Sequence, residues 1–193
     1  QLSITGESGI PYTLTSNDVE LTSSASFSIK LNPTDQVHLA GLINKNGSSS
    51  DDGTRFHLSA QDNWALGAAN SADISDSKNN FITSINLNSP SITSAVYDAR
   101  LGVFTITGEY FPALHGDSND INTSRFNVSG ENDYSYTLTS KNVDIISESS
   151  FSISLNPDDL IEVTKLLNKN GTSAQSGAFY NLSVLDNWAV AAA

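Results

Sequence analysis

The sequence predicts a mainly β protein made of tandem antiparallel β-sandwich modules, each with one inserted α-helix. Three observations support this: an internal repeat, short stretches of alternating apolar and polar residues, and one helical stretch in each copy. Residues 1–69 align without a gap on residues 125–193, and 32 of the 69 aligned positions are identical. A match of this length indicates two copies of one folded unit, offset by 125 − 1 = 124 residues.

Each copy contains short stretches with the two-residue alternation of half-buried strands. In the first copy we expect strands at Leu2–Thr5, Tyr12–Thr15, Val19–Thr22, Phe27–Leu31 and Arg55–Ala60. Many short strands separated by turn signals are typical of an antiparallel sandwich.

A strand that runs directly into a helix is the clearest element of the repeat. Residues 27–31 alternate apolar and polar side chains, and residues 151–155 repeat the pattern. Asn32 can cap a helix that begins at proline, where a missing N–H costs nothing. We expect this helix at Pro33–Lys45, and Gly171 is a natural stop for its counterpart in the second copy.

Residues 70–124 occur only once, between the two copies. Phe81–Leu87 is predicted to be a strand, and Ser89-Pro90 is a break after it. Two further strands, Ser91–Tyr97 and Gly102–Thr107, are joined by a turn.

The break at Ser89-Pro90 suggests two repeat units, residues 1–89 and residues 90–193. With a period of 124, the first unit lacks the opening strands that residues 90–124 give to the second. The second unit lacks the counterpart of residues 70–89. The chain, which has no methionine, resembles a mature product or a window from a longer protein.

Composition excludes several classes of function. The net charge is −12, with only nine Lys and Arg residues, so nucleic-acid binding is not expected. Apolar runs are too short for membrane insertion. The absence of cysteine excludes disulfides, thiolate metal sites and cysteine nucleophiles, and it fits proteins that are exported unfolded.

The stretch from Pro90 to Phe111 contains a Pro-x-Ile strand and then Ile106, Gly108 and Phe111. It resembles the opening strands of immunoglobulin-like domains of the TIG type. The whole repeat, with its Leu-Asn-Lys-Asn-Gly and Asp-Asn-Trp signatures, is similar to the tandem repeats of giant bacterial surface and type I-secreted proteins. This resemblance implies Ig-like modules in an extracellular or cell-surface protein of the adhesin type, often accompanied by calcium-binding segments.

The sequence contains no recognisable catalytic motif. His38 and His57 correspond to Glu162 and Asn181 in the second copy, so the repeat does not need either histidine. We therefore expect that the protein is not an enzyme.

Calcium is the best-motivated ligand, because Ca²⁺ binds six to eight oxygens that closely spaced Asp and Asn side chains can supply. Two acidic loops have this density, and two acids in the adjoining strand region could converge on the first loop. The candidate ligands are Asp117, Asn119 and Asp120, with Asp98 and Glu109 beside them, and Asp73 and Asp76 in the second loop. The alternative is that these residues only cap polar turns.

Our first hypothesis is a structural tandem-repeat segment of an extracellular adhesin, stalk or matrix fibre that calcium stiffens. Its partners would be neighbouring repeats, other copies of itself, glycans or cell surfaces. One alternative is a self-assembling filament, sheath or surface-layer subunit that is completed by strand exchange. Another is a carbohydrate-binding module that uses the aromatic residues Tyr134, Tyr136, Phe179 and Tyr180.

Overall fold

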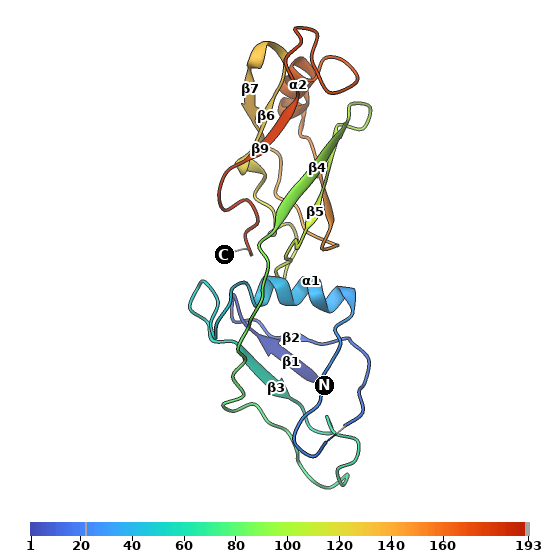
Figure 1. The fold of residues 1–193 in the computed structure, drawn as a ribbon, viewed down its shortest axis with the longest axis vertical. Helices are drawn as coiled ribbons and strands as arrows, with labels where there is room; N and C mark the ends of the chain where they lie inside the picture. The colour runs from blue at the N-terminus through green and yellow to red at the C-terminus, as the bar shows by residue number, and fades with distance from the viewer. Residues whose placement is uncertain (22, 192–193) are drawn as a thin grey trace. The chain divides into compact units, whose positions relative to one another are not determined.

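The computed structural model describes residues 1–21 and 23–191 and is mainly β (Figure 1). Among these residues the strands form three antiparallel sheets of three strands each, with the orders β2-β1-β3, β4-β5-β8 and β7-β6-β9. The chain divides into two compact units, and the main division falls between Ser89 and Pro90. Of the described residues, unit 1 contains 1–21, 23–89, 112–115 and 191, and unit 2 contains 90–111 and 116–190.

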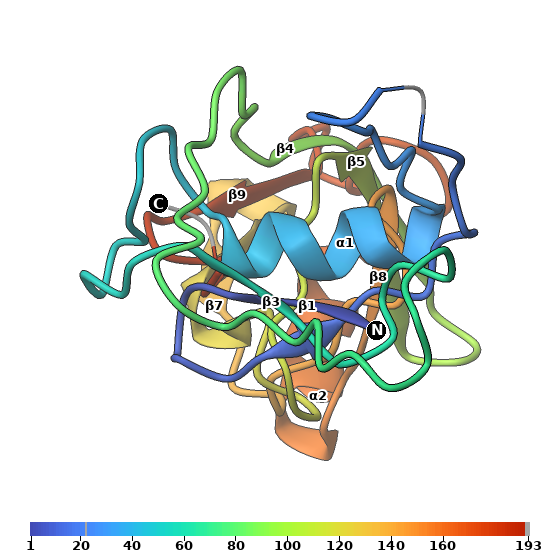
Figure 2. The ribbon, with the colours of Figure 1, turned by 90° about the horizontal axis from the view of Figure 1, so that it is seen from below.

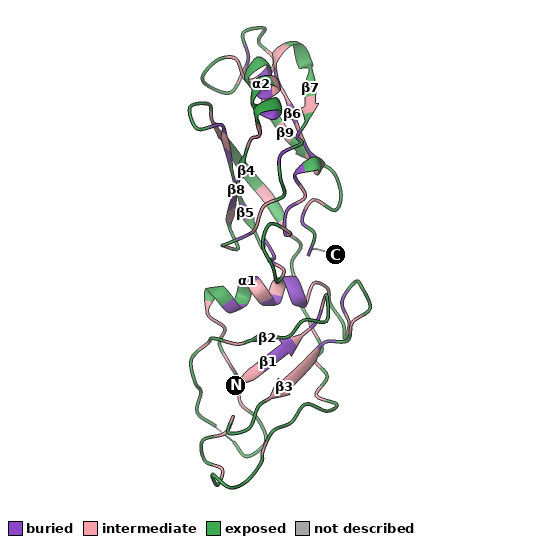
Figure 3. Ribbon diagram, turned by 180° about the vertical axis from the view of Figure 1, so that it is seen from behind, coloured by how far each residue is buried: buried purple, intermediate pink, exposed green. Residues whose placement is uncertain are grey.

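Unit 1 contains one sheet and one long helix. Its elements are β1 (Leu2–Thr5), β2 (Tyr12–Thr13), α1 (Pro33–Leu42) and β3 (His57–Ala60). α1 lies across one side of the sheet (Figures 1 and 2). Ile4, Leu39 and Leu42 form the buried centre between helix and sheet, where Figure 3 shows part of β1 and one end of α1 as buried.

Unit 2 contains the other two sheets. Its strands are β4 (Ser91–Asp98), β5 (Val103–Glu109), β6 (Phe126–Ser129), β7 (Ser135–Thr137), β8 (Ser150–Ser154) and β9 (Asn181–Val184). Its helices are α2 (Pro157–Leu166) and two 3-10 turns, η1 (Thr123–Arg125) and η2 (Glu131–Asp133). Side chains from both sheets are fully buried, including Ile106 on β5, Phe126 on β6 and Ile153 on β8.

The two copies of the repeat pair their strands in the same register. In unit 1, Leu2 pairs with Ala60 and Ile4 with Tyr12. The residues 124 positions later pair in the same way in unit 2, as β6 with β9 and β6 with β7. Both long helices begin with the predicted cap, in which Asn32 or Asn156 accepts the N–H three residues further on at 2.8 Å.

Both copies also need a glycine at the same place. A Cβ on Gly6 would lie 2.0 Å from the Leu42 carbonyl oxygen, and one on Gly130 would lie 2.4 Å from that of Leu166. These contacts are too short for any side chain, and the neighbouring atom belongs to the backbone. The end of β1 or β6 can therefore approach the end of the helix only through glycine.

The helix α1 ends at Leu42, three residues before the predicted end at Lys45. The last helical turn closes when the Ile43 N–H donates to the Leu39 carbonyl at 2.7 Å. The Leu42 carbonyl accepts the Glu7 N–H at 2.8 Å from the end of β1, so it does not continue the helical ladder. The helix therefore ends where its last carbonyl bonds to a distant part of the chain.

Other predicted strands are shorter or absent. β2 stops at Thr13 because the N–H groups of Thr15 and Ser16 donate to a carboxylate instead of a strand. β3 begins at His57 rather than at the predicted Arg55. A strand is also predicted at residues 19–22, but residues 19–21 form none, and Thr22 lies outside the described residues. Residues 81–87 form only isolated bridges, at Phe81 and Ser84.

The prediction of a strand at residues 27–31 holds for one copy only. Residues 150–154 form β8, whereas the described residues 23–31 form no strand. β8 exists because β5 pairs with it.

Candidate functional site

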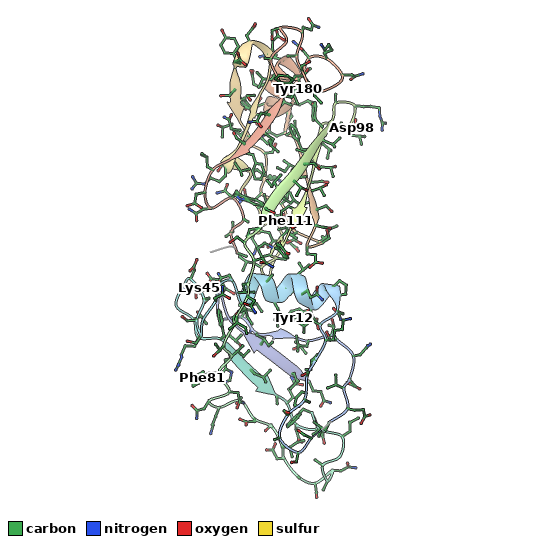
Figure 4. All side chains as sticks on the ribbon, in the orientation of Figure 1. Tyr12, Lys45, Phe81, Asp98, Phe111 and Tyr180 are labelled. Atoms are coloured by element: carbon green, nitrogen blue, oxygen red, sulfur yellow. The ribbon has the colours of Figure 1, made fainter. Side chains whose placement is uncertain are left out.

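A buried aspartate lies at the centre of each copy of the repeat. Asp35, in the first turn of α1, is fully buried. Its carboxylate accepts the Tyr12 hydroxyl at 2.8 Å, and the Thr15 N–H and hydroxyl at 3.0 and 2.8 Å. The N–H of Ser16 donates at 2.8 Å and its hydroxyl at 2.5 Å. Figure 4 shows Tyr12 beside α1.

Asp159 repeats this arrangement in unit 2. It is also fully buried and accepts the Tyr136 hydroxyl at 3.0 Å. Thr139 donates its N–H and hydroxyl at 2.9 and 2.6 Å, and Ser140 donates its N–H and hydroxyl at 2.8 and 2.5 Å. Each donor lies 124 residues after its counterpart, so the two sites are built by the same residues.

These hydrogen bonds decide the charge of the buried carboxylates. Burial by itself raises the pKa of Asp35, but hydrogen bonds from Ser16 and Thr15 outweigh it and lower the pKa to about 2. The same balance lowers the pKa of Asp159. Both groups are therefore ionised at neutral pH and act as acceptors for surrounding donors.

A second repeated contact explains the Asn-Lys-Asn-Gly signature. The Asn44 side-chain amide donates to Glu7 at 3.2 Å, and Asn168 donates to Glu131 at 2.8 Å. The same glutamate oxygens accept a main-chain N–H from Asp52 or Ser176, at 3.2 and 3.0 Å. The first asparagine of the signature thus holds the loop after the helix against the end of β1 or β6.

Sequence reasoning missed the roles of Asp35 and Glu7. The signal that could have revealed both roles is in the alignment, because the aspartate, the glutamate and the bonded Tyr, Thr, Ser and Asn residues are identical in both copies.

Three of the predicted calcium ligands cap turns. Asp98 accepts the N–H groups of Arg100 and Leu101 at 2.9 and 3.1 Å, in the turn between β4 and β5. Asp73 accepts the Ser75 N–H and hydroxyl at 3.0 and 2.7 Å, and Asp76 accepts the Lys78 N–H at 3.1 Å. These hydrogen bonds also lower the pKa values of Asp73 and Asp76.

The expected convergence of Asp98 and Glu109 on one loop is wrong. Asp98 pairs with Val103 at one end of the β4–β5 hairpin, and Glu109 pairs with Ser91 at the other. Six residues of strand separate the two ends, a distance on the order of 20 Å. Figure 4 likewise shows Asp98 at the turn and Phe111, two residues after Glu109, at the opposite end.

The remaining candidates differ in burial. Asp117 is exposed and Asn119 is half-buried, whereas Asp120 is fully buried and accepts the Ile145 N–H at 2.5 Å. Within residues 1–21 and 23–191, no three His, Asp or Glu side chains gather closely enough to hold a metal ion.

The histidines of unit 1 take part in packing contacts. The His38 ring stacks on Tyr12 with centroids 4.5 Å apart, and His57 meets the edge of Phe81 at 6.0 Å. These contacts fit the observation that the second copy has other residues at both positions.

Comparison of the chain with protein-family models, curated proteins and solved structures finds no match. In the part of the chain that the structure describes, no helix has the length and apolar character needed to span a membrane.

The first prediction concerns the buried carboxylate. We expect Asp35→Asn to destabilise unit 1 by about 3 kcal/mol, because an amide NH₂ would face N–H and O–H donors in a buried site. Hydrogen–deuterium exchange by mass spectrometry can report the two units separately, and faster exchange is expected in peptides of unit 1. The exposed Asp18→Asn serves as the control, and equal exchange in both variants would contradict the prediction.

The second prediction concerns pH. The pKa of Asp35 is lower in the folded than in the unfolded protein, so ionised Asp35 stabilises the fold above about pH 4. This stabilisation is lost as the pH falls towards 2 and Asp35 becomes protonated. For Asp35 the shift from 3.8 to about 2 amounts to about 2 kcal/mol. Unfolding in urea at several pH values should show a steeper loss for the wild type than for Asp35→Asn. Parallel pH profiles would show that Asp35 does not contribute.

Proposed function

We propose that this chain is a structural tandem-repeat segment of an extracellular adhesin, stalk or matrix fibre. The observation that carries the proposal is the repetition of one folding solution. The cap, the buried aspartate with its donors, and the strand register all recur after 124 residues. Repetition of a folded unit along one chain is how proteins build extended supports.

The residues that differ between the copies support a mechanical role. Identical residues form caps, close approaches and internal hydrogen bonds, whereas neither histidine of the first copy has a histidine counterpart in the second. His38 becomes Glu162, and the exposed Phe179 corresponds to Arg55. An activity shared by both copies would need its side chains in both.

The sandwich part of the proposal is supported by contacts in unit 2. Phe126 on β6 and Phe151 on β8 meet edge to face at 6.1 Å, and both rings contact Trp188. Residues from two sheets that share one aromatic centre are typical of Ig-like sandwiches, and α2 would be the inserted helix.

An extracellular position fits the composition. A net charge of −12 keeps a long polymer soluble, and a chain without cysteine folds without an oxidation step after export.

The third prediction tests the location. Antibodies raised against residues 1–193 should label intact cells of the source organism or bind material in the culture medium. An antibody against a cytoplasmic protein, which should label only permeabilised cells, is the control. Labelling by the repeat antibody only after permeabilisation would contradict the extracellular role.

The fourth prediction tests calcium. We propose that Ca²⁺ bound at the acidic loops raises the melting temperature on the order of 5 °C in millimolar calcium, and that EGTA reverses the effect. Mg²⁺ at equal concentration is the control, and Asp117→Asn and Asp73→Asn, made separately, would locate the ion. Identical melting curves with calcium and with EGTA would remove calcium from the proposal and leave the repeat role in place.

A self-assembling filament or surface-layer subunit is the second candidate. It is favoured by residues 26–30, which correspond to β8 but form no strand in unit 1. A carbohydrate-binding module is the third, favoured by the exposure of Tyr134 and Phe179, at 69% and 78%. The other two aromatic candidates are engaged internally, since Tyr136 donates to Asp159 and Tyr180 donates to the Lys169 carbonyl.

A further inference from the structure

We propose that residues 26–30 of unit 1 are an acceptor edge that pairs with a β-hairpin of the β4–β5 type, supplied by a repeat unit other than the two in this chain. The occupant is a segment equivalent to residues 90–124, which precede the second copy. This inference rests on the proposed function as a serial repeat, and it identifies the partner of each unit.

Unit 2 shows the pairing directly. β5 lies antiparallel to β8, with Thr107 opposite Ser150, Ile106 opposite Phe151 and Phe104 opposite Ile153. The Leu155 N–H extends the contact by donating to the Gly102 carbonyl at 2.9 Å. The same hairpin on unit 1 would place its equivalents of Ile106 and Phe104 opposite Phe27 and Ile29.

The acceptor segment is held at both ends in the same way in the two units. Before it, Ser23 accepts the Ser26 N–H at 3.0 Å, as Ser147 accepts that of Ser150 at 3.0 Å. After it, the Asn32 N–H donates to the Ser16 hydroxyl at 2.8 Å, as Asn156 donates to Ser140 at 2.9 Å. The segment is therefore held in the same way in both units, but among the described residues only in unit 2 does a hairpin pair with it.

Side chains of unit 1 that the hairpin and the chain after it would cover are more exposed than their counterparts in unit 2. Phe151 and Ile153 are 3% and 0% exposed, whereas Phe27 and Ile29 are only half-buried. The same comparison holds further back, since Leu21 is 60% exposed and its counterpart Ile145 is 3% exposed.

Unit 1 has two of the aromatic rings that meet in unit 2, but within the part of the chain that the structure describes it has no counterpart of Phe111 beside them. Phe27 stacks on Trp64 with centroids 5.9 Å apart and planes at 27°, and Phe151 stacks on Trp188 at 6.1 Å and 29°. In unit 2, Phe111 at the end of the hairpin contacts both rings. A hairpin on unit 1 would bring the equivalent ring to Phe27 and Trp64.

The count of strands identifies the source of the hairpin. The described part of the chain has one hairpin of this type and two acceptor segments, and β8 already holds that hairpin. Exchange between two copies would fill one edge and empty another, with no gain in strand pairs. A hairpin from an additional repeat fills the edge and leaves β8 paired.

The acceptor edge also carries a lysine, Lys30, which disfavours non-specific pairing with other strands. Lys30 corresponds to the exposed Ser154, so its charge can stay in water when the hairpin is bound. A lysine at this position opposes unspecific edge-to-edge association.

The test is a fusion of residues 90–124 to the N-terminus of the full chain, so that Ser124 precedes Gln1 as it precedes Arg125 in the natural sequence. We expect amide exchange of the peptide covering residues 26–31 to slow by about tenfold or more, as in a paired strand. Acrylamide quenching of the tryptophan fluorescence, to which Trp64 and Trp188 both contribute, should decrease. Residues 150–155 in the same molecule provide the reference for a paired strand.

The matched control carries Ile106→Asp in the added hairpin only, so the original chain is unchanged. It should restore fast exchange at residues 26–31, because a charge would replace a fully buried side chain. Exchange that is equally fast in the unfused chain, the fusion and the control would overturn the proposal. Self-association of the unfused chain in sedimentation, with protection of 26–31 that rises with concentration, would overturn the assignment to an additional repeat.

The outcome is distinguishable from failure of the proposed function. If the fusion shows no hairpin pairing, the proposed function still stands or falls with the surface-labelling experiment. Labelling only inside cells would remove the extracellular role even if the hairpin docks.

Discussion

The structure depends on a buried carboxylate in each copy of the repeat. An ionised group in the interior is costly unless donors surround it, and here three residues provide five donor groups. The Ser16 hydroxyl donates to Asp35 and accepts the Asn32 N–H, so one side chain links the segment after β2, the helix cap and the end of residues 26–31. The strand, the helix and the acceptor segment are therefore fixed together by a single group.

Because this arrangement is the same in both copies, a difference between the copies must have another cause. Comparing the copies therefore shows which elements depend on local sequence and which depend on distant parts of the chain. The sequences Phe-Ser-Ile-Lys-Leu and Phe-Ser-Ile-Ser-Leu are nearly identical, yet only the second forms a strand. The difference is the presence of β5 beside it. A strand is a property of a pair, whereas the capped helices form in both copies from signals within a few residues of Asn32 and Asn156.

The same distinction explains what could be predicted from the sequence. The helix starts, β1 and the β4–β5 hairpin follow local patterns, and the structure contains them. The end of α1 and the short β2 are harder to predict, because at both places the backbone bonds to groups distant in sequence, Glu7 and Asp35. The proposed convergence of Asp98 and Glu109 failed because the antiparallel register of the hairpin places them at opposite ends.

The identity of the repeated residues bears on the proposed role. Asp35, Asn44 and Gly6 have counterparts that make the same contacts, and these contacts are internal to each unit. What both copies also present is the segment that begins at Ser26 or Ser150, with its end contacts already made. Main-chain hydrogen bonding along such an edge tolerates changes in exposed side chains, so surface residues can diverge while the pairing is retained. The proposed joining of like units in series would use this shared framework and this one strand edge.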